Sequence, residues 1–457
     1  MNEILIVGSG FAAGVLALHF LESSFKPQQI VIVGPDNLGA GNAYGCLDDS
    51  FRLNVRAQIM WIKPDQREEF LKWSEIEIND PEATHSSGKF FRRKDFARFM
   101  NHKFSLTPGY EKIRHVKQKV VKILKGKLMN DNHCFWKIKL DDGSFLKAKY
   151  IILATGNPSP EWPCDFELKD QKYHQHRSNH LIENPWKGEW LNYIDKTDSI
   201  FFIGGGLTSL DGIYALYSRG HLGPINVIAP MGKFPPTQAD WERKRSPPWP
   251  NSKNETLSAA KLLKFFRSYL PENDPSSKKW QDAWEELRED ISVRWKELSD
   301  FDQLRLKDKV KSYWSHFRYR SSPQTIDAVN QLIKKGQLLI HKARLNKIIS
   351  SKNKIILDCS NGKLFLTDRL INCSGAGHDK LILQMISDNI AFPDNFNFSL
   401  KVDKNNTVFM KDKSLRETLF MVSPTLEASL GDVAAASEVS LQALRVVNFI
   451  KKNIYLK

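Results

Sequence analysis

The segment that most constrains the fold of this chain is its start, ILIVGSGFAAG. Four apolar residues lead into a glycine-rich turn, which is followed at once by an apolar helical stretch. A strand, a glycine turn and a helix in this order are typical of a dinucleotide-binding unit. Gly8 would form the tight turn, Gly10 would let the backbone approach a pyrophosphate, and Gly14 would pack the helix closely on the strand. The residues that begin the helix, where free N–H groups bind phosphates, are Phe11 and Ala12.

The pattern recurs near the middle of the chain, in SIFFIGGGLTS. Gly204 and Gly206 take the places of the first two glycines, and the third place is held by another small residue, Ser209. We therefore expect a second dinucleotide site at Gly204, Gly206, Thr208 and Ser209. Lys233, just past the next strand, could pair with the 2′-phosphate of NADP, since no acid is found there. The alternative is that Lys233 is a solvated surface charge.

The second strand of the first unit, QIVIVGP, lacks an expected acid. Such strands normally end in an acidic residue that holds the ribose hydroxyls, and here Gly34 takes that position. The sequence leaves two substitutes, which are Asp36 and a backbone group.

Length and composition indicate an ordered, cytoplasmic protein with two or three domains. The 457 residues exceed one ordinary domain, and 67 basic against 52 acidic residues give a net charge of +15. The lysines are dispersed, so nucleic acid is an unlikely partner, and no segment indicates a membrane span. Five scattered cysteines without a close pair argue against a zinc site and against a dithiol active site.

Between the two glycine motifs, residues 110–150 alternate apolar and polar positions around an Asp-Asp-Gly turn, which predicts a β-meander. The meander leads into YIILATGNP, a buried strand that exits at Thr155 and Gly156. Residues 234–320 are helical and aromatic, and Trp280, Trp284 and Trp295 recur at helical spacing. We interpret this stripe as core, with a helical cap over a substrate pocket as the alternative.

Several further motifs appear in a fixed order. They read GNAYG, LNVRAQIM, FFRRKDF, GGLTSLD, HFRYRSSP and SPT. With the opening glycine turn they resemble a bacterial FAD/NAD(P)-binding family that is similar in layout to flavin-dependent N-hydroxylating and Baeyer–Villiger monooxygenases. The resemblance spans most of the chain.

The resemblance implies an α/β fold with two Rossmann-like dinucleotide-binding domains, each a three-layer unit with a parallel sheet. The FAD domain would comprise residues 1–158 and 369–457, and the NAD(P) domain residues 159–368, with the helical insertion at about 234–320. Residues 369–377 would return the chain to the FAD domain. The motif residues implied in flavin binding are Tyr44, Asn54, Met60, Thr155, Gly156 and Gly375.

Two more groups of residues complete the predicted cofactor sites. Arg318 and Arg320 could hold NADPH or an acidic substrate through bidentate bonds, with surface salt bridges as the alternative. Gly431 and Asp432 would cap a long terminal helix whose N-terminus points at the flavin ring.

These features predict an oxidoreductase that uses FAD and NADPH or NADH, and a monooxygenase in particular, acting on a small molecule by amine N-hydroxylation or a related oxygen insertion. The sequence indicates no catalytic side chain and no metal site. Two alternatives remain open: a flavin dehydrogenase or oxidase without nicotinamide, and a non-catalytic nucleotide-binding protein.

Overall fold

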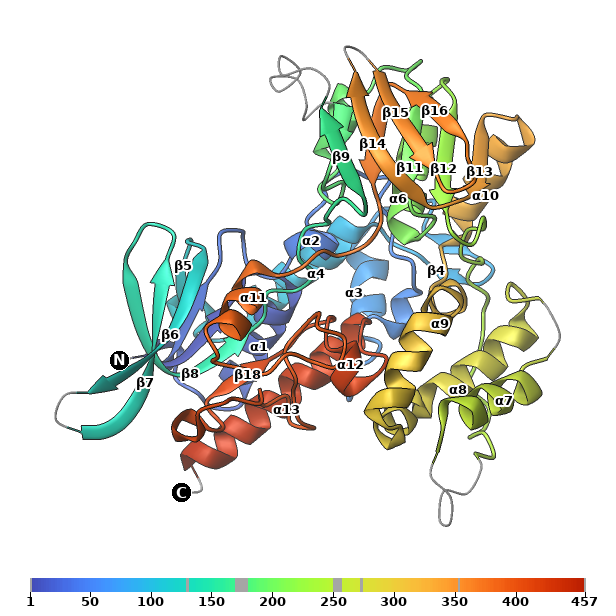
Figure 1. Cartoon of the computed structure of the whole chain (residues 1–457). Helices are drawn as coiled ribbons and strands as arrows, with labels where there is room; N and C mark the ends of the chain where they lie inside the picture. Colours follow the sequence, from blue (N-terminus) through green and yellow to red (C-terminus); the bar gives the residue numbers. More distant parts are fainter. Residues whose placement is uncertain are drawn as a thin grey trace.

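The chain folds into two α/β domains and a helical insertion, shown in Figure 1. The computed structural model describes residues 2–128, 131–168, 180–249, 257–271, 274–351 and 354–455. Both described chain ends lie in the first domain (Figure 1). The predicted fold class is confirmed by a first sheet of parallel strands that continues into the β-meander, a parallel second sheet and a helical insertion. Within these residues, no helix is long and apolar enough to cross a membrane.

The first domain is built on a sheet in the order β5-β2-β1-β8-β7-β6, with β18 also paired to β8. Strands β5, β2, β1, β8 and β18 are parallel, whereas β8, β7 and β6 form the antiparallel meander. The strands are β1 (Asn2–Val7), β2 (Ile30–Val33), β5 (Arg114–Val116), β6 (Val120–Leu128), β7 (Asp131–Leu140), β8 (Phe145–Leu153) and β18 (Leu419–Met421). A separate hairpin consists of β3 (Thr84–His85) and β4 (Gly88–Lys89).

This sheet is buried on both faces, because alternate residues of each parallel strand point to opposite sides. Ile4 and Ile6 of β1 pack among the helices α1, α4 and α13, while Leu5 and Val7 pack against the meander and the segment after α11. The helices of this domain are α1 (Phe11–Glu22), α2 (Gly41–Tyr44), α3 (Glu69–Glu77), α4 (Arg93–Leu106), α11 (Lys380–Ser387), α12 (Glu427–Leu430) and α13 (Ala436–Tyr455). The result is the expected three-layer unit.

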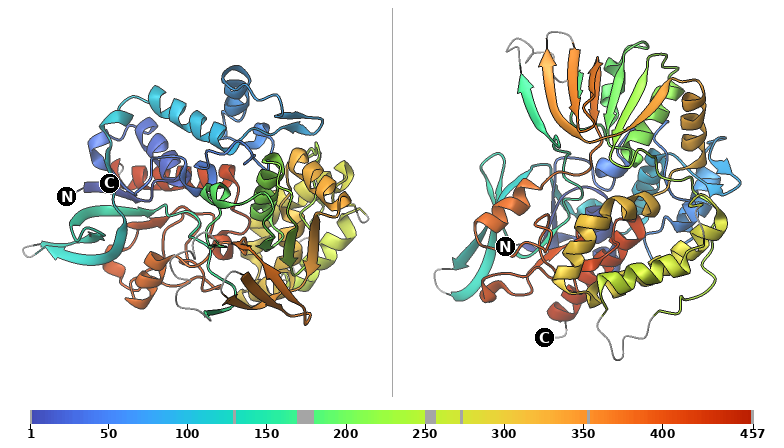
Figure 2. Two further views of the ribbon diagram at one scale, coloured as in Figure 1. Left: turned by 90° about the horizontal axis from the view of Figure 1, so that it is seen from above. Right: turned by 45° about the vertical axis from the view of Figure 1, so that its right-hand side comes forward.

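The second domain has a parallel sheet in the order β10-β17-β11-β12-β13. Helices cover one face, and a four-stranded sheet in the order β16-β15-β14-β9 covers the other, as the upper part of Figure 1 and the right view of Figure 2 show. The elements are β9 (Asp165–Leu168), β10 (Leu181–Ile182), β11 (Ile200–Ile203), α6 (Leu207–Ser218), β12 (Ile225–Ala229), α10 (Pro323–Lys334), β13 (Leu338–Lys342), β14 (Leu345–Ser351), β15 (Lys354–Cys359), β16 (Leu364–Thr367) and β17 (Arg369–Asn372).

One predicted crossover is wrong. Residues 369–377 were expected to return the chain to the FAD domain, but β17 pairs in parallel with β11 at the centre of the second sheet. The return comes later, and β18 is the strand that joins the first sheet, beside β8. The two segments were indistinguishable in sequence because each is a short apolar run that suits a buried parallel strand.

The helical insertion lies between β12 and α10 and packs against the C-terminal part of the first domain (Figures 1 and 2). Its helices are α7 (Ala259–Tyr269), α8 (Lys278–Glu297) and α9 (Asp300–Arg318). Trp280 and Trp284 are buried, as predicted for a core stripe. Trp295, in the last turn of α8, donates its indole N–H to the Ala428 carbonyl of α12 at 2.9 Å. The stripe therefore also docks the insertion on the first domain.

A buried ion network joins the same two parts. Asp432 accepts hydrogen bonds from Arg288 of α8 at 2.5 Å and from Arg318 of α9 at 2.6 Å. Arg288 also binds Glu285 at 2.5 Å, and Arg320 binds the second oxygen of Glu285 at 2.6 Å. A buried carboxylate between two guanidiniums is stable only while all partners are present, because each charge has lost its water.

We therefore expect Asp432→Asn to destabilise the protein by about 3–5 kcal/mol, since it leaves the buried Arg318 without its carboxylate and Arg288 with Glu285 alone. Chemical denaturation followed by circular dichroism measures the change. The control is Asp388→Asn, which removes an exposed carboxylate paired with Lys122 and should leave the unfolding midpoint close to that of the wild type. Equal effects of the two variants would contradict a structural role for the network.

Candidate functional site

The first glycine turn is held by main-chain bonds on both sides. The Gly8 N–H donates to the Val33 carbonyl at 2.7 Å, and the Ala154 N–H donates to the Val7 carbonyl at 2.7 Å. Gly8 has φ of +121°, and a Cβ there would lie 2.2 Å from the Ala154 carbonyl oxygen. A side chain is thus excluded both by the backbone conformation and by the neighbouring strand end.

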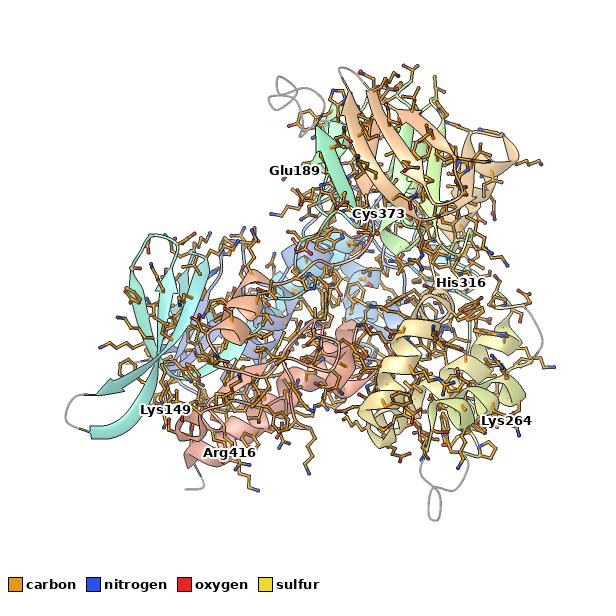
Figure 3. The ribbon with its side chains drawn as sticks, in the orientation of Figure 1. Lys149, Glu189, Lys264, His316, Cys373 and Arg416 are labelled. Carbon is orange, nitrogen blue, oxygen red and sulfur yellow. The ribbon has the colours of Figure 1, made fainter. Side chains whose placement is uncertain are left out.

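The second glycine turn repeats this geometry. The Gly204 N–H donates to the Ile228 carbonyl at 2.8 Å, and the Cys373 N–H donates to the Ile203 carbonyl at 2.9 Å. Gly204 has φ of +100°, and a Cβ there would lie 2.4 Å from the Cys373 carbonyl oxygen. Cys373 therefore occupies the same position beside the second turn that Ala154 occupies beside the first. Figure 3 shows Cys373 at the end of the second domain that faces the first.

Both helices begin with an open N-terminus. Gly10 precedes α1 with φ, ψ of −76°, −164°, Gly206 precedes α6 with −88°, −169°, and neither helix has a side-chain cap. No atom lies within 4 Å of a Cβ built on Gly206, and the nearest to one on Gly10 is the Gly41 Cα at 3.5 Å. Free N–H groups facing open space suit a pyrophosphate. The residues present therefore fit one dinucleotide at each turn.

The strand ends beside the two turns carry the other predicted small residues. Thr155 has a buried hydroxyl with no hydrogen-bond partner among the described residues, which suits an acceptor or donor on a ligand. Gly156 adopts φ of +70°, and its carbonyl accepts a bond from the Ser423 hydroxyl at 3.4 Å. Gly375 follows β17, so it lies beside the second turn and not in the FAD domain as expected. It occupies there the place that Gly156 occupies in the first domain.

The structure explains the missing acid at Gly34. A Cβ on Gly34 would lie 2.6 Å from both the amide nitrogen and the hydroxyl oxygen of Ser9, so Ser9 fills the place of a side chain. The Ser9 hydroxyl also accepts a bond from the Asp36 N–H at 3.2 Å. The exposed Asp36 carboxylate pairs with Lys187 at 3.2 Å. That Asp36 holds the ribose stays a prediction.

Most residues implied by the resemblance lie in the first core. The ring of Tyr44 packs on Phe11, with centroids 5.5 Å apart, and burial raises the pKa of Tyr44 to about 12. Met60 is buried in the same cluster, as are Ala12 and Phe11 in the first turn of α1. Asn54 is half-buried in the loop that leads to Met60. Their contacts with flavin remain predictions.

The second site is flanked by a cation. Thr208 is half-buried in the first turn of α6, and the buried Ser209 donates its hydroxyl to the Gly206 carbonyl at 2.7 Å. The exposed Lys233 has its carbonyl oxygen 3.3 Å from a Cβ built on Gly205. Lys233 also acts on His316, at the end of α9, where burial and the lysine charge lower the pKa of the imidazole. Figure 3 shows His316 between the second domain and the insertion.

Arg318 and Arg320 were predicted to bind NADPH or an acidic substrate, or else to form surface salt bridges. The structure places them elsewhere. Both are buried, and they bind Asp432 and Glu285. Burial opposes ionisation of Asp432, but Arg318 and Arg288 outweigh it and lower its pKa to about 2. Burial likewise opposes ionisation of Glu285, and Arg288, Arg320 and Arg318 lower its pKa to about 2. Both carboxylates are thus held charged: Asp432 binds the insertion from the first domain, and Glu285 binds Arg288 and Arg320.

Two details of the C-terminal segment correct the prediction. The long helix begins at Ala436 and continues to Tyr455, so Gly431 and Asp432 do not cap it. Gly431 has φ of +84°, and a Cβ there would lie 2.9 Å from the Cα of Ser292 in α8. This glycine therefore allows the close approach of the insertion.

Sequence reasoning missed the contacts that join the domains. Arg93, which begins α4, donates to Asp211 of α6 at 2.7 Å. Burial raises the pKa of Asp211 to about 6, although the charge of Arg93 acts in the opposite direction. No local pattern marks such a pair, because its members are far apart in the chain.

Comparison with known proteins agrees with this geometry. A family model described as FAD-NAD(P)-binding matches residues 5–158, about a third of the chain. Residues 5–158 therefore belong to an FAD-NAD(P)-binding domain. This match confirms the resemblance for that part. Comparison with curated protein sequences found no match.

Solved structures share the whole fold. The chain is similar to an ornithine N-hydroxylase from Kutzneria sp. 744 (TM-score 0.62, 12% identity, 99% of each chain). It is also similar to an L-lysine 6-monooxygenase from Pseudomonas syringae (TM-score 0.65, 11% identity, 99% of this chain and 100% of that one). A third likeness is to a bacillithiol disulfide reductase from Bacillus cereus (TM-score 0.55, 12% identity, 99% of each chain). At these identities the likeness establishes the fold.

A matched pair of substitutions tests the first turn. Gly8→Ala should lower the free energy of unfolding by about 1–3 kcal/mol, because it combines a positive φ with a clash against Ala154. Gly10→Ala should fold as the wild type does, since its Cβ has room, but retain less flavin because the methyl group stands where the pyrophosphate approaches. Thermal unfolding and the flavin-to-protein absorbance ratio measure the two effects. Full flavin retention by Gly10→Ala would contradict the assigned site.

Proposed function

We propose that this protein is an FAD-dependent, NADPH-using monooxygenase that hydroxylates the nitrogen of a small amine. The observation that carries the proposal is the repeated geometry of the two glycine turns, each with an open helix N-terminus and a glycine packed on a strand end. One turn lies in the segment matched as FAD-NAD(P)-binding, and the other follows β11, the central strand of the parallel sheet in the second domain. Two such turns suit an enzyme that brings two dinucleotides together.

The chain's own residues have defined tasks in this proposal. Gly8, Gly10 and the N-terminus of α1 bind the FAD pyrophosphate, and Gly204, Gly206 and the N-terminus of α6 bind NADPH. FAD, when bound and reduced, supplies the oxygen chemistry, and the protein supplies placement and exclusion of water. One atom of O₂ goes to the amine nitrogen and the other to water, and NADPH provides the two electrons.

The cysteines favour this reaction over disulfide reduction. All five are free, and the described structure contains no disulfide. Burial raises the pKa of Cys46, Cys164 and Cys359 to about 11, and raises that of Cys373 well above its usual value. Thiols of this kind are poor nucleophiles at neutral pH. A hydroxylation, which needs no protein thiol, suits the chain better.

The proposal is tested by purifying the protein and recording its visible spectrum. We expect the absorbance of oxidised flavin, its loss on anaerobic addition of NADPH, and its recovery when air is admitted. A colourless protein that cannot be reconstituted with FAD would refute the proposal. A flavin reduced by an amine in the absence of NADPH would favour the dehydrogenase or oxidase alternative.

The choice of nicotinamide cofactor depends on Lys233. Lys233 is exposed and its backbone lies beside the second turn, which supports a pairing of its ammonium with the 2′-phosphate that NADH lacks. We expect Lys233→Ala to weaken NADPH binding about tenfold, as the loss of a charge-assisted hydrogen bond does, and to change NADH binding little. Lys334→Ala, at an exposed site on α10, is the control. Stopped-flow rates of flavin reduction at several cofactor concentrations measure both affinities, and equal losses for the two cofactors would contradict this role.

A further inference from the structure

A cavity of about 120 Å³ lies where the helical insertion meets the C-terminal part of the first domain. Its wall combines α7, α8 and α9 of the insertion with residues 396, 427, 431 and 432. Buried apolar cavities of about 150 Å³ accept a benzene ring, so this space holds one ring or a short alkyl chain. Two parts of the fold that are distant in sequence must dock to create it.

The wall is mainly apolar and aromatic. Phe266, Ile291, Trp295, Trp314 and Phe396 form much of it. Trp295 and Phe396 meet edge to face with centroids 6.0 Å apart, which connects α8 to the C-terminal segment. Such a surface binds a hydrocarbon body and offers few hydrogen bonds to a polar one.

Four side chains of the wall are charged or titratable, and two of them are engaged in the protein. Asp432 is bound by Arg288 and Arg318, and the Lys307 ammonium lies 3.4 Å from the Phe396 carbonyl oxygen and 5.0 Å from the centre of its ring. Both sets of contacts join the insertion to the C-terminal segment, so these two groups are engaged within the protein.

Glu427 is the exception within the cavity. Among the described residues, no hydrogen-bond donor or salt-bridge cation lies within bonding distance of its carboxyl group. Burial raises its pKa, while Asp432 adds to this effect and the charges of Lys311 and Arg318 oppose it. Glu427 is half-buried, and a ligand that carries a hydrogen-bonding cation would give its unpaired carboxyl the partner that it lacks.

Lys311 also lines the cavity, but its side chain is exposed to water. An ion pair formed at the exposed ammonium of Lys311 contributes little binding free energy, whereas one formed at the half-buried carboxyl of Glu427 contributes more. The charge preference of the cavity is therefore decided by Glu427.

We propose that this cavity binds a primary monoamine with an apolar body, such as an arylalkylamine or alkylamine, with its amino group at Glu427 and its hydrocarbon part between Trp295, Trp314 and Phe396. The inference rests on the proposed function, since it names the class of amine to be hydroxylated. Diamines are poor ligands, because the cavity has one free carboxyl and otherwise an apolar wall for the second ammonium. Amino acids are poor ligands because their carboxylate would have to pair at the exposed Lys311, where an ion pair contributes little.

The test uses the purified full-length protein with its flavin and isothermal titration calorimetry, which does not depend on turnover. The probes are 2-phenylethylamine and hexylamine, with 2-phenylethanol as the neutral analogue and 3-phenylpropionate as the anionic one. L-Ornithine and cadaverine represent amines with a second charge. We expect the two monoamines to bind at least about tenfold more tightly than ornithine, cadaverine and the carboxylate.

Glu427→Gln keeps the shape of the side chain and removes its charge. We expect it to weaken 2-phenylethylamine binding at least about tenfold and to leave 2-phenylethanol binding within about threefold of the wild type. Glu289→Gln, which changes an exposed carboxylate on α8, should bind both probes as the wild type does. Circular dichroism and flavin content show that each variant is folded.

Three results would overturn the inference: no binding of either monoamine, tighter binding of 3-phenylpropionate than of the amine, or equal effects of Glu427→Gln on the amine and the alcohol. Each can occur while NADPH still reduces the flavin, in which case the proposed function stands. A protein without flavin refutes the proposed function whatever the titrations show. The two failures are therefore distinguishable.

Discussion

Both dinucleotide turns depend on one steric constraint, the contact between the first glycine of the turn and the carbonyl at the end of a parallel strand. Gly8 lies against Ala154, and Gly204 lies against Cys373, at distances that exclude any side chain. The contact sets the direction in which each helix leaves its sheet. As a result the N-termini of α1 and α6 are open where a dinucleotide would approach. Two separate domains meet this requirement with the same backbone conformations.

The position of the helical insertion depends on a different interaction. Asp432 binds Arg288 and Arg318 from two helices of the insertion, and Glu285 links the network to Arg320. Such a network is expensive to bury, so it contributes geometric specificity more than net stability. Gly431 adds a close backbone approach to α8. These contacts hold the insertion in one orientation over the C-terminal segment of the first domain.

That orientation has a chemical consequence. The walls of the apolar cavity come from both parts, so the cavity exists only in the docked arrangement. In the proposed enzyme the two glycine turns bind the cofactors, and the insertion with its cavity selects the amine. A change of substrate would then need substitutions around Glu427 and the aromatic wall, and the dinucleotide sites could stay as they are.

By itself the sequence determined the local features: the two glycine turns, the meander with its Asp-Asp-Gly turn, the buried helical stripe and the absence of a cysteine pair. These were predictable because each depends on a short run of residues and on steric rules that act within it. Only the tertiary structure decided which sheet β17 joins and that Ser9 fills the space of a side chain at Gly34. It also decided that Arg318 and Arg320 bind Asp432 and Glu285, and that Glu427 lines an apolar cavity. The physical reason is that ion pairs, strand partners and cavity walls join residues that are distant in the chain, so no local pattern records which residues meet.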